Sequence, residues 1–300
     1  MRQVVPPKWI DYVSQSSLLE QSAYWETLRE WSLSNVQRVT LDSGTTVIAK
    51  MGHESMAGEL DVYQSLLEPL QLPRPDLLEV YDNETSNILI MADLGRYTVE
   101  MDPQQIHFVN AAKKLAEIRD KSVEHLDSLS PSVYKKYLKS QESVLQELKS
   151  IKDCHTLFSP EELDILNTCL DKLPQLLDDL YRNFSITITH NDYNTKNLMI
   201  TNQSIIPIDW SNAYLSPHLG DLYCLLEEAE RFDVDQSAVI EAYSEEVEKD
   251  CVEWEIQVGG ICWLIHGLCW VCEEGIHKVP ASRSWIPDMI LSINDCLKKI

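Results

Sequence analysis

The chain has 300 residues, of which 44% are hydrophobic, and a formal net charge of −23. This length is sufficient for one large domain or for two lobes that share a cleft. The excess of negative charge argues against a nucleic-acid partner, because the phosphates would be repelled. The first residues lack the apolar segment of a signal peptide, and no uninterrupted apolar run approaches the roughly 18 residues that span a bilayer. We therefore expect a cytoplasmic protein without a membrane partner, whose eight cysteines are reduced thiols.

The first ninety residues predict a small lobe that is rich in strands. Trp9, Tyr12, Trp25 and Leu28 recur at helix-like spacing, which predicts a helical extension over residues 1–30. Short β-type runs and one amphipathic segment then follow each other in the order β-β-α-β-β. The predicted elements are two strands at 36–41 and 45–49 around a tight turn at 42–44, a helix at 54–67, and two strands at 78–81 and 88–91.

The rest of the chain is mostly helical in pattern. Residues 103–183 and the chain after residue 220 read as helices, and a strand-loop-strand-strand unit at 185–210 lies between them. We therefore predict an α+β fold with a small β-rich lobe followed by a large helical lobe, and a ligand site in the cleft between them. The lobes are expected at 1–95 and 96–300, with a hinge at 91–95.

The polar loop of the strand unit carries the residues with the clearest chemistry. His190, Asp192 and Asn197 follow one strand, and Asp209 arrives at the end of the hairpin that comes next. Phosphoryl transfer needs a carboxylate near the acceptor hydroxyl, and an amide oxygen and a second carboxylate for magnesium. The His-x-Asp-x-x-x-x-Asn spacing is common by chance, and Asp209 alone is also consistent with a helix cap. The residues gain weight from their place between β-type runs.

Two upstream residues complete an ordered set. Lys50 ends the strand-like run Val-Ile-Ala-Lys, and Glu59 lies on the next predicted helix, where it can pair with the lysine. A single lysine at a strand end is usually a surface residue, and a glutamate in a helix is usually solvated. The order of lysine strand, glutamate helix, connector, polar loop and second carboxylate is what distinguishes this chain.

This ordered set resembles the protein kinase-like fold, and more closely the aminoglycoside phosphotransferase and choline kinase-like family. The loop at 190–197 resembles the catalytic loop, and Leu-Ile-Met-Ala-Asp-Leu-Gly at 89–95 resembles the hinge between the lobes. Ile-Asp-Trp at 208–210, followed by Gly-Asp-Leu at 220–222, is similar to the motifs that this family has in place of Asp-Phe-Gly. The resemblance covers residues 30–300 in order.

The resemblance implies a role for each of these residues, with ATP and Mg²⁺ as cofactors. Lys50 would neutralise the α- and β-phosphates while Glu59 holds it in place. Asn197 and Asp209 would hold Mg²⁺, and Asp192 would accept or align the proton of the acceptor hydroxyl. The other implied roles are adenine contacts by the hinge (Met91, Ala92, Asp93 and Leu94) and bracing of the catalytic loop (His190 and Asp221).

The segment before the lysine strand departs from the family. The family usually has glycine or small residues there, which let backbone amides approach phosphate. Residues 31–36 contain no glycine, and we expect the side chains of Ser32, Ser34 and Asn35 to donate hydrogen bonds to the nucleotide instead. Arg119 stands where the family often has histidine, and we expect it to have a packing role.

The acceptor is expected to be a small, hydroxylated cation. Residues 221–274 hold 15 acidic and two basic residues. We interpret most of these acids as solvated helix faces and others as an acidic wall that attracts a cationic substrate. Trp270 beside Glu273 and Glu274 is suitable for an ammonium group. The sequence thus predicts ATP-dependent transfer of the γ-phosphoryl group to a hydroxyl of an aminoglycoside, an amino alcohol or a related basic molecule.

Two other functions remain open. An atypical protein kinase is disfavoured, because only twelve positions separate Asp209 from Asp221 and leave no long activation segment to dock a peptide. A pseudokinase that acts as a binding or structural module is favoured by the glycine-free segment and opposed by the intact Lys50 and Asp192. A nucleotide-binding measurement separates these alternatives.

Cys262, His266, Cys269 and Cys272 raise the question of a zinc site. The first three share one face of a predicted helix. The helix is as apolar as a core helix, however, and structural zinc sites with four ligands usually fold from loops. We therefore favour buried thiols in the C-terminal lobe.

Overall fold

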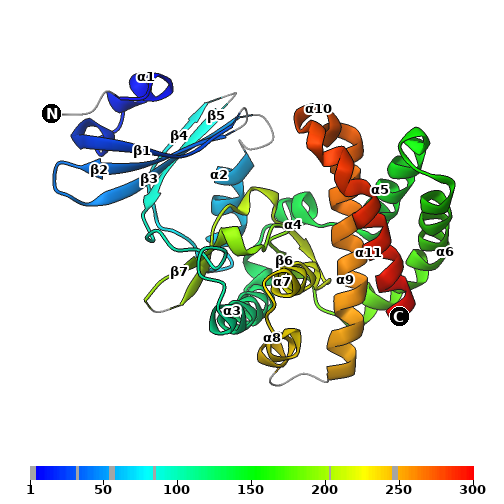
Figure 1. Cartoon of the computed structure of the whole chain (residues 1–300). Coiled ribbons are helices and arrows are strands. Elements are labelled where there is room, and N and C mark those ends of the chain that lie inside the picture. The colour runs from blue at the N-terminus through cyan, green and yellow to red at the C-terminus, as the bar shows by residue number, and fades with distance from the viewer. Residues whose placement is uncertain (1–4, 32–33, 54–57, 84–85, 203, 245–248) are drawn as a thin grey trace.

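The computed structural model describes residues 5–31, 34–53, 58–83, 86–202, 204–244 and 249–300. Figure 1 shows a β-sheet at one end of the molecule and a larger group of helices at the other, with α2 and several short strands between them. Within the described residues, the sheet has five antiparallel strands in the order β1-β2-β3-β5-β4. The strands are β1 (Ser22–Glu30), β2 (Ser34–Leu41), β3 (Thr46–His53), β4 (Leu77–Asn83) and β5 (Ser86–Ala92).

The first thirty residues differ from the prediction. Short helical turns occur only up to residue 21, and Ser22–Glu30 is strand β1, so the helical prediction is wrong for these residues. Trp9 and Trp25, whose rings lie 5.7 Å apart, pack in one hydrophobic cluster. A strand buries Trp25 as well as a helix would, and it also gains a ladder of hydrogen bonds with β2. The helical turns are Pro7–Trp9, α1 (Ile10–Val13) and Leu19–Gln21.

The other predicted elements of this region are present. Gly44 has a φ of 84° in the turn between β2 and β3, a conformation that favours glycine, and its amide donates to the carbonyl of Leu41 at 2.8 Å. The predicted helix is found as α2 (Glu59–Val62), which continues as a π-helical turn over Tyr63–Leu67. The part of this prediction at 54–57 lies outside the described residues.

Helices dominate the C-terminal region, as predicted. Buried side chains of α3, α5, α6, α7, α9 and α11 form one continuous hydrophobic core. The helices are α3 (Gln105–Glu124), α4 (Pro131–Tyr137), α5 (Gln141–Asp153), α6 (Pro160–Asn183), α7 (Gly220–Arg231), α8 (Gln236–Tyr243), α9 (Lys249–Trp270), a π-helical turn (Val271–Gly275), α10 (Ile276–Lys278) and α11 (Ile286–Lys299). Short 3₁₀ turns lie between helices at Leu126–Ser128, His155–Leu157 and Pro280–Trp285, and between the short strands at Thr195–Asn197 and Trp210–Asn212.

One helical stretch is more apolar than the sequence reading suggested. Cys251–Lys278 is, by length and composition alone, able to cross a membrane, but 72% of its apolar window is buried inside the fold. A side chain at Gly259 would come within 2.6 Å of the backbone of Leu219 and Gly220, so glycine allows the close approach of α9 to the start of α7. The stretch therefore packs as a core helix.

Four short strands position the polar loop. β6 (Thr187–Thr189) pairs with β9 (Tyr214–Ser216), and β7 (Leu198–Ile200) pairs with β8 (Ile205–Pro207). A second hydrophobic cluster joins these strands to the large sheet, since Leu60 and Leu89 pack in it together with Ile188 and Trp210. This shared packing sets the position of the sheet relative to the loop.

Candidate functional site

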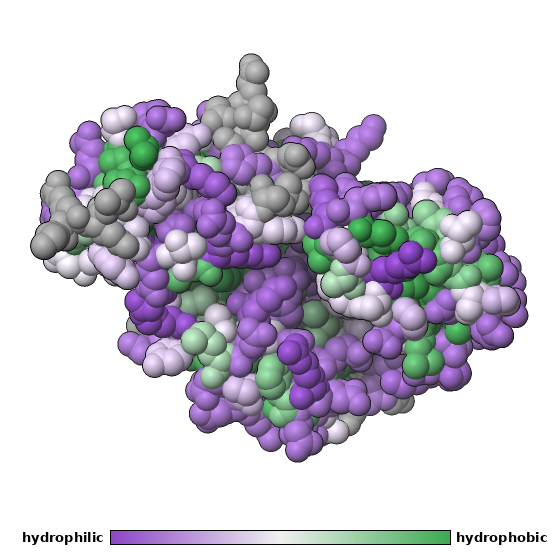
Figure 2. Space-filling model, turned by 45° about the horizontal axis from the view of Figure 1, so that its top comes forward, coloured by the Kyte–Doolittle hydropathy of each residue, from purple (hydrophilic) through white to green (hydrophobic). Residues whose placement is uncertain are grey.

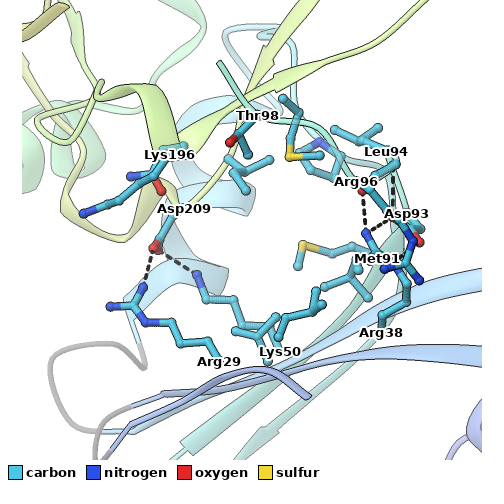
Figure 3. A pocket seen from close by; sticks show the side chains of 18 of the residues that line it. Arg29, Arg38, Lys50, Met91, Asp93, Leu94, Arg96, Thr98, Lys196 and Asp209 are labelled. Atoms are coloured by element: carbon cyan, nitrogen blue, oxygen red, sulfur yellow. Dashed lines mark hydrogen bonds and ion pairs between the residues drawn. The ribbon is translucent and has the colours of Figure 1, made fainter. Parts of the chain in front are cut away.

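A cleft of about 500 Å³ lies between the large sheet and the short strands. Figure 2 shows the surface hollowed between the two parts of the molecule. Apolar side chains of β1, β2 and β3 line the cleft together with Met199 and Ile208. Figure 3 shows charged groups at two ends of the cleft, with Lys50 and Asp209 at one and Arg38 and Asp93 at the other. The predicted nucleotide and metal residues that line it are Lys50, Glu59, Met91, Ala92, Asp93, Leu94, Asn197 and Asp209.

Lys50 connects the two sides of this cleft. Its Nζ lies 2.5 Å from Oε2 of Glu59 and 2.7 Å from Oδ1 of Asp209, so the predicted pair with Glu59 is formed. Burial alone would lower the pKa of Lys50, but the two carboxylates raise it above its ordinary value. Burial raises the pKa of Glu59, and the ammonium group opposes this rise. Lys50 is therefore held as a cation within the cleft.

Asp209 occupies an unusual backbone conformation. Its φ of 64° and ψ of 59° lie in the left-handed region, which costs a non-glycine residue about 1–3 kcal/mol. Burial alone would raise its pKa, but Lys50 and Arg29 lower the pKa to about 2. Nη1 of Arg29 lies 3.6 Å from Oδ2 of the carboxylate. The residue is thus ionised at neutral pH and turned toward cations.

The catalytic-loop segment is held by two buried groups. The carboxylate of Asp221 accepts hydrogen bonds from the amides of His190 at 2.6 Å and Asn191 at 2.8 Å. Nε2 of His190 lies 3.0 Å from the carbonyl of Ile208, and its Nδ1 accepts from the amide of Asp192. Burial lowers the pKa of His190 to about 4, so the imidazole is neutral and donates through Nε2. These contacts match the bracing arrangement predicted for His190 and Asp221.

Asp192 and Asn197 lie together in this loop. Nδ2 of Asn197 donates to the backbone carbonyl of Asp192 at 2.9 Å and to its Oδ2 at 2.8 Å. Burial raises the pKa of Asp192, the Lys196 ammonium opposes the rise, and Asp209 adds to it. The Asp192 side chain is 28% exposed, which leaves it open to a ligand. A carboxylate with a raised pKa in such a position is suited to proton transfer.

The residues predicted to form the hinge offer the cleft mainly their backbone, because the Asp93 side chain is already paired. Residues 91–94 line the cleft. Nε of Arg38, on β2, donates to Oδ2 of Asp93 at 2.6 Å, and Oδ1 of Asp93 accepts from the amide of Gly95 at 3.0 Å. Because the Asp93 carboxylate has these partners, its backbone is the part suited to contact a ligand. Figure 3 shows this pair at the end of the cleft opposite Lys50 and Asp209.

Two residues of the glycine-free segment are not brought into the cleft. Oδ1 of Asn35 accepts from Trp9 and from Gln37, each at 2.8 Å, on the sheet face opposite the cleft, contrary to the predicted nucleotide contact. Alternation along β2 is the reason, since Val36 takes the cleft face. Ser34 is on the same face as Val36 but does not line the cleft, and its buried Oγ has no partner among the described residues. Ser32 lies outside the described residues.

The residues predicted to contact the acceptor also lie elsewhere. Trp270, Glu273 and Glu274 are absent from the cleft lining, and Glu274 pairs with Lys278 at 2.8 Å. They belong to the π-helical turn at the end of α9 and the residue before it. None of the described residues of α9 lines the cleft.

Several acids of the 221–274 segment have structural partners. Glu255 pairs with the buried Arg119 at 2.9 Å, and Arg119 also donates to the carbonyls of Pro217 and His218. This is the packing role expected for Arg119. Glu228 accepts a hydrogen bond from Thr195. Fewer than the 15 acidic residues of this segment are therefore free to attract a cationic substrate.

The cysteines considered for zinc are part of the core. Cys262, Cys269 and Cys272 are buried, and the structure records them as free thiols. His266 instead has Nδ1 3.0 Å from Oε1 of Glu147. Within the described ranges, no group of three or more His, Cys, Asp or Glu side chains is arranged to hold a metal ion.

A magnesium ion bound together with a ligand would use a different donor set. Asp209 offers a carboxylate, and the hydrogen bonds described for Asn197 use Nδ2, which leaves its amide oxygen as the atom for a metal. Hard oxygen ligands supplemented by phosphate and water are what Mg²⁺ requires. The residues present fit that ion.

Sequence reasoning missed the arginines of the cleft, Arg29, Arg38 and Arg96. Arg38 follows Val36 by two positions on β2, so strand alternation could have placed it. Arg96 pairs with Glu26 at 2.7 Å, a contact between distant parts of the chain. The position of Arg29 depends on a β-bulge in β1, between Thr27 and Arg29, that no sequence pattern indicated.

The geometry can be compared with known proteins. Residues 28–254 match the model of the phosphotransferase enzyme family. The chain belongs to this family. The match confirms the resemblance identified from the sequence motifs. A search of curated proteins found no match for this phosphotransferase.

Solved structures confirm the fold of the phosphotransferase. The ADP-bound aminoglycoside phosphotransferase APH(2'')-Ib is 15% identical, with a TM-score of 0.65 over 97% of this chain and 99% of that chain. The ethanolamine kinase of Plasmodium vivax is 18% identical, with a TM-score of 0.64 over 94% and 85% of the two chains. The amicoumacin kinase hAmiN is 15% identical, with a TM-score of 0.61 over 92% and 88%. The α+β, protein kinase-like fold predicted above is therefore confirmed.

Proposed function

We propose that this phosphotransferase moves the γ-phosphoryl group of ATP to a hydroxyl of a small cationic molecule. One observation carries the proposal. The Lys50 ammonium bridges Glu59 and Asp209 inside a cleft that Asn197 also lines, and Asn197 is hydrogen-bonded to Asp192, which lies beside the cleft and not in its lining. These are the groups that phosphoryl transfer needs, and they lie in and beside one cavity.

The nucleotide is assigned to the sheet side of the cleft. Adenine would lie between Ile48 and Met199, with its polar edge against the backbone of residues 91–94. Lys50 would bind the α- and β-phosphates, and Glu59 keeps its side chain extended toward them. The apolar lining excludes water, which strengthens the charge interactions at the phosphates.

Asp192 is assigned to the acceptor hydroxyl. Its carboxylate takes or aligns the hydroxyl proton, the acceptor oxygen forms a bond to the γ-phosphorus, and the bond from that phosphorus to the β–γ bridging oxygen breaks to release ADP. Asn197 and Asp209 would hold Mg²⁺, which when bound neutralises charge on the phosphate oxygens. Asn197 also fixes the orientation of Asp192 through its Nδ2.

Three facts support a small cationic acceptor. The net charge is −23, and acids outnumber bases in residues 221–274 even when Glu228 and Glu255, which have structural partners, are set aside. The chain between Asp209 and Asp221 is taken up by a 3₁₀ turn and strand β9, which leaves no segment to dock a peptide. The similar structures include proteins named as aminoglycoside phosphotransferases, an ethanolamine kinase and an amicoumacin kinase.

A screen of acceptors tests the proposal. ADP release is measured with MgATP and a panel of aminoglycosides, choline, ethanolamine, amino sugars and hydroxylated peptide antibiotics, and neutral sugars serve as the matched control class. We expect turnover with at least one cation and none with the neutral sugars. Good ATP binding without turnover of any cation would contradict the cationic acceptor.

A pseudokinase is the second candidate. Two observations favour it, the glycine-free segment after β1 and the occupation of both Asp209 oxygens by Lys50 and Arg29. A thermal-shift measurement decides between the two functions. A rise in melting temperature with MgATP, larger than with Mg²⁺ alone, supports the enzyme, and its absence supports the pseudokinase.

A further inference from the structure

Arg29 is a cleft residue that the proposed function leaves without a role. Its Nη1 lies 3.6 Å from Oδ2 of Asp209, and its guanidinium lies over the ring of Trp31, 5.4 Å from the centroid. Figure 3 shows Arg29 and Lys50 reaching toward Asp209 from the same side of the cleft. Two cations from the sheet therefore converge on one carboxylate.

A β-bulge explains why Arg29 points into the cleft. Thr27 pairs with Gln37 and Arg29 pairs with Val36, so Leu28 is an extra residue on β1. The hydroxyl of Thr27 donates to Oε1 of Gln37 on the opposite face of the sheet, whereas Leu28 and Arg29 both line the cleft. Regular alternation would have placed Arg29 on the face of Thr27. Bulges are enriched beside active sites, where they re-aim a side chain in this way.

The other two cleft arginines have closer partners. Arg38 is bound to Asp93 at 2.6 Å, and Arg96 is bound to Glu26 at 2.7 Å. The contact of Arg29 with Asp209 is longer, and the Arg29 side chain is 46% exposed. Because the Arg29 end of this ion pair is exposed to solvent, the pair contributes little to stability. Arg29 is therefore free to change partner when a ligand arrives.

The charge of Arg29 also acts on the carboxylate of Asp192. Burial raises the pKa of Asp192, and Arg29 is among the charges that oppose this rise. Arg29 thus lies within electrostatic range of both Asp192 and Asp209. The proposed function assigns the acceptor hydroxyl to Asp192 and Mg²⁺ to Asp209, so the transferred phosphoryl group would lie near both carboxylates.

We propose that Arg29 is a phosphate-binding residue, which supplies from a side chain the positive charge that a glycine-rich turn would supply through backbone amides. The inference rests on the proposed function. Arginine is suited to this role, because its fork of N–H donors binds two phosphate oxygens at once. Arg29 and Lys50 both contact the Asp209 carboxylate. With nucleotide bound, both cations would bind phosphate oxygens, and Asp209 would be available to hold Mg²⁺.

Calorimetric titrations test this assignment without relying on turnover. Wild type, Arg29→Ala and Arg29→Lys are titrated with MgATP, MgADP and adenosine. For Arg29→Ala we expect a loss in MgATP affinity of roughly tenfold to a hundredfold, the size of a lost hydrogen bond to a charged group, and less than about twofold for adenosine. Arg29→Lys is expected to recover part of the loss, because it keeps the charge but not the fork.

Lys8→Ala is the matched control. Lys8 pairs with Glu30, the neighbour of Arg29 on β1, at 3.0 Å, and it does not line the cleft. Removing this cation lowers the charge near the same strand without touching the site, so MgATP affinity should change by less than about twofold. The melting temperature of each variant without ligand confirms that it is folded.

Three outcomes would overturn the inference. An equal loss for adenosine and MgATP would mean that Arg29 shapes the pocket instead of contacting phosphate. Unchanged MgATP affinity would mean that it makes no contact, and tighter binding by Arg29→Ala would mean that it only shields Asp209. A wild-type protein that binds no nucleotide would instead overturn the proposed function, and this inference with it.

Discussion

The two walls of the cleft carry opposite charges. The sheet wall presents Arg29 and Lys50, and the loop wall presents Asp209 and Asn197, with Asp192 hydrogen-bonded to Asn197 beside the cleft. Arg29 and Lys50 both pair with Asp209 across the cleft. Each wall is also the complement of one half of a metal–phosphate ligand, since the carboxylates suit the metal and the cations suit the phosphates. If the cleft binds such a ligand as proposed, the metal and the phosphates replace the ion pairs between the two walls.

The walls also differ in how they are built. The sheet wall follows strand alternation except at the bulge of β1, and its side chains are placed by pairing with β2 and β5. The loop wall has no such ladder. Asn191 and Asp209 both adopt positive φ angles, and buried hydrogen bonds to Asp221 hold the segment. Strain and polar anchoring replace regular structure where the chemistry is proposed.

The largest effect on turnover is expected from a substitution in the polar loop that carries Asp192. Asp192→Ala should lower kcat by about 100- to 10,000-fold, the usual contribution of a positioned acid or base, while MgATP affinity stays nearly unchanged. Steady-state kinetics and calorimetry on the same preparation measure both quantities. Turnover that survives the substitution would show that Asp192 is not the residue that handles the hydroxyl proton.

A substitution in the sheet wall is expected to change MgATP affinity as well as kcat. Lys50→Met should weaken MgATP binding by roughly tenfold or more and also lower kcat, because a charge on the phosphates is lost. The same substitution leaves the buried Glu59 without its ion-pair partner. The double variant Lys50→Met with Glu59→Gln removes that unpaired charge and serves as the stability control.

Full recovery of MgATP affinity in this double variant would contradict a direct contact of Lys50 with phosphate. In that case the loss in the single variant would come from the unpaired carboxylate. Unfolding by urea shows independently how much stability each variant has lost.

The coupling of the two walls predicts a pH dependence. The pKa of Asp209 falls from 3.8 to about 2 on folding, because Lys50 and Arg29 outweigh burial. A lowered folded-state pKa gives stability that is present above pH 4 and is lost as the pH falls toward 2. The contribution is about 2 kcal/mol. The difference in unfolding free energy between wild type and Asp209→Asn should therefore shrink from pH 6 to pH 3. A difference that stays constant over this range would contradict the stabilising role of the Asp209 ion pairs.

The outer face of the sheet wall should affect stability alone. Asn35→Ala removes the acceptor of Trp9 and Gln37 in a buried position, so the free energy of unfolding should fall by about 1–3 kcal/mol. Its MgATP affinity should be the same as in wild type. A weaker MgATP affinity at unchanged stability would instead support the nucleotide contact that the sequence predicted for Asn35.

The smallest effect is expected far from both walls. Glu273→Gln and Glu274→Gln should change the KM for an accepted cation by less than about twofold, because neither residue lines the cleft and exposed charges are screened. Kinetics at low and at high salt measure this. An increase of tenfold or more at low salt would revive the acceptor role that the sequence predicted for these residues.

Sequence reasoning worked where a residue type and its local element together restrict position. Lys50 and Glu59 pair as predicted, because a strand followed by a helix leaves few ways to bury both charges. It failed for Trp25, whose spacing fits a helix although pairing with β2 makes a strand. It also failed for Asn35, because the choice between two faces of a strand depends on which face is packed against the rest of the protein.

The sequence by itself determined the order of the elements from β2 onward and the reactive groups from Lys50 to Asp209, because strand and helix periodicity and the spacing from His190 to Asp209 are local properties. Only the tertiary structure decided which groups meet. It placed Arg29 in the cleft through a one-residue bulge, turned Asn35 away and left Trp270 outside. The reason is that a single extra residue reverses the face of every side chain after it, and the pairing of distant strands determines where that residue falls.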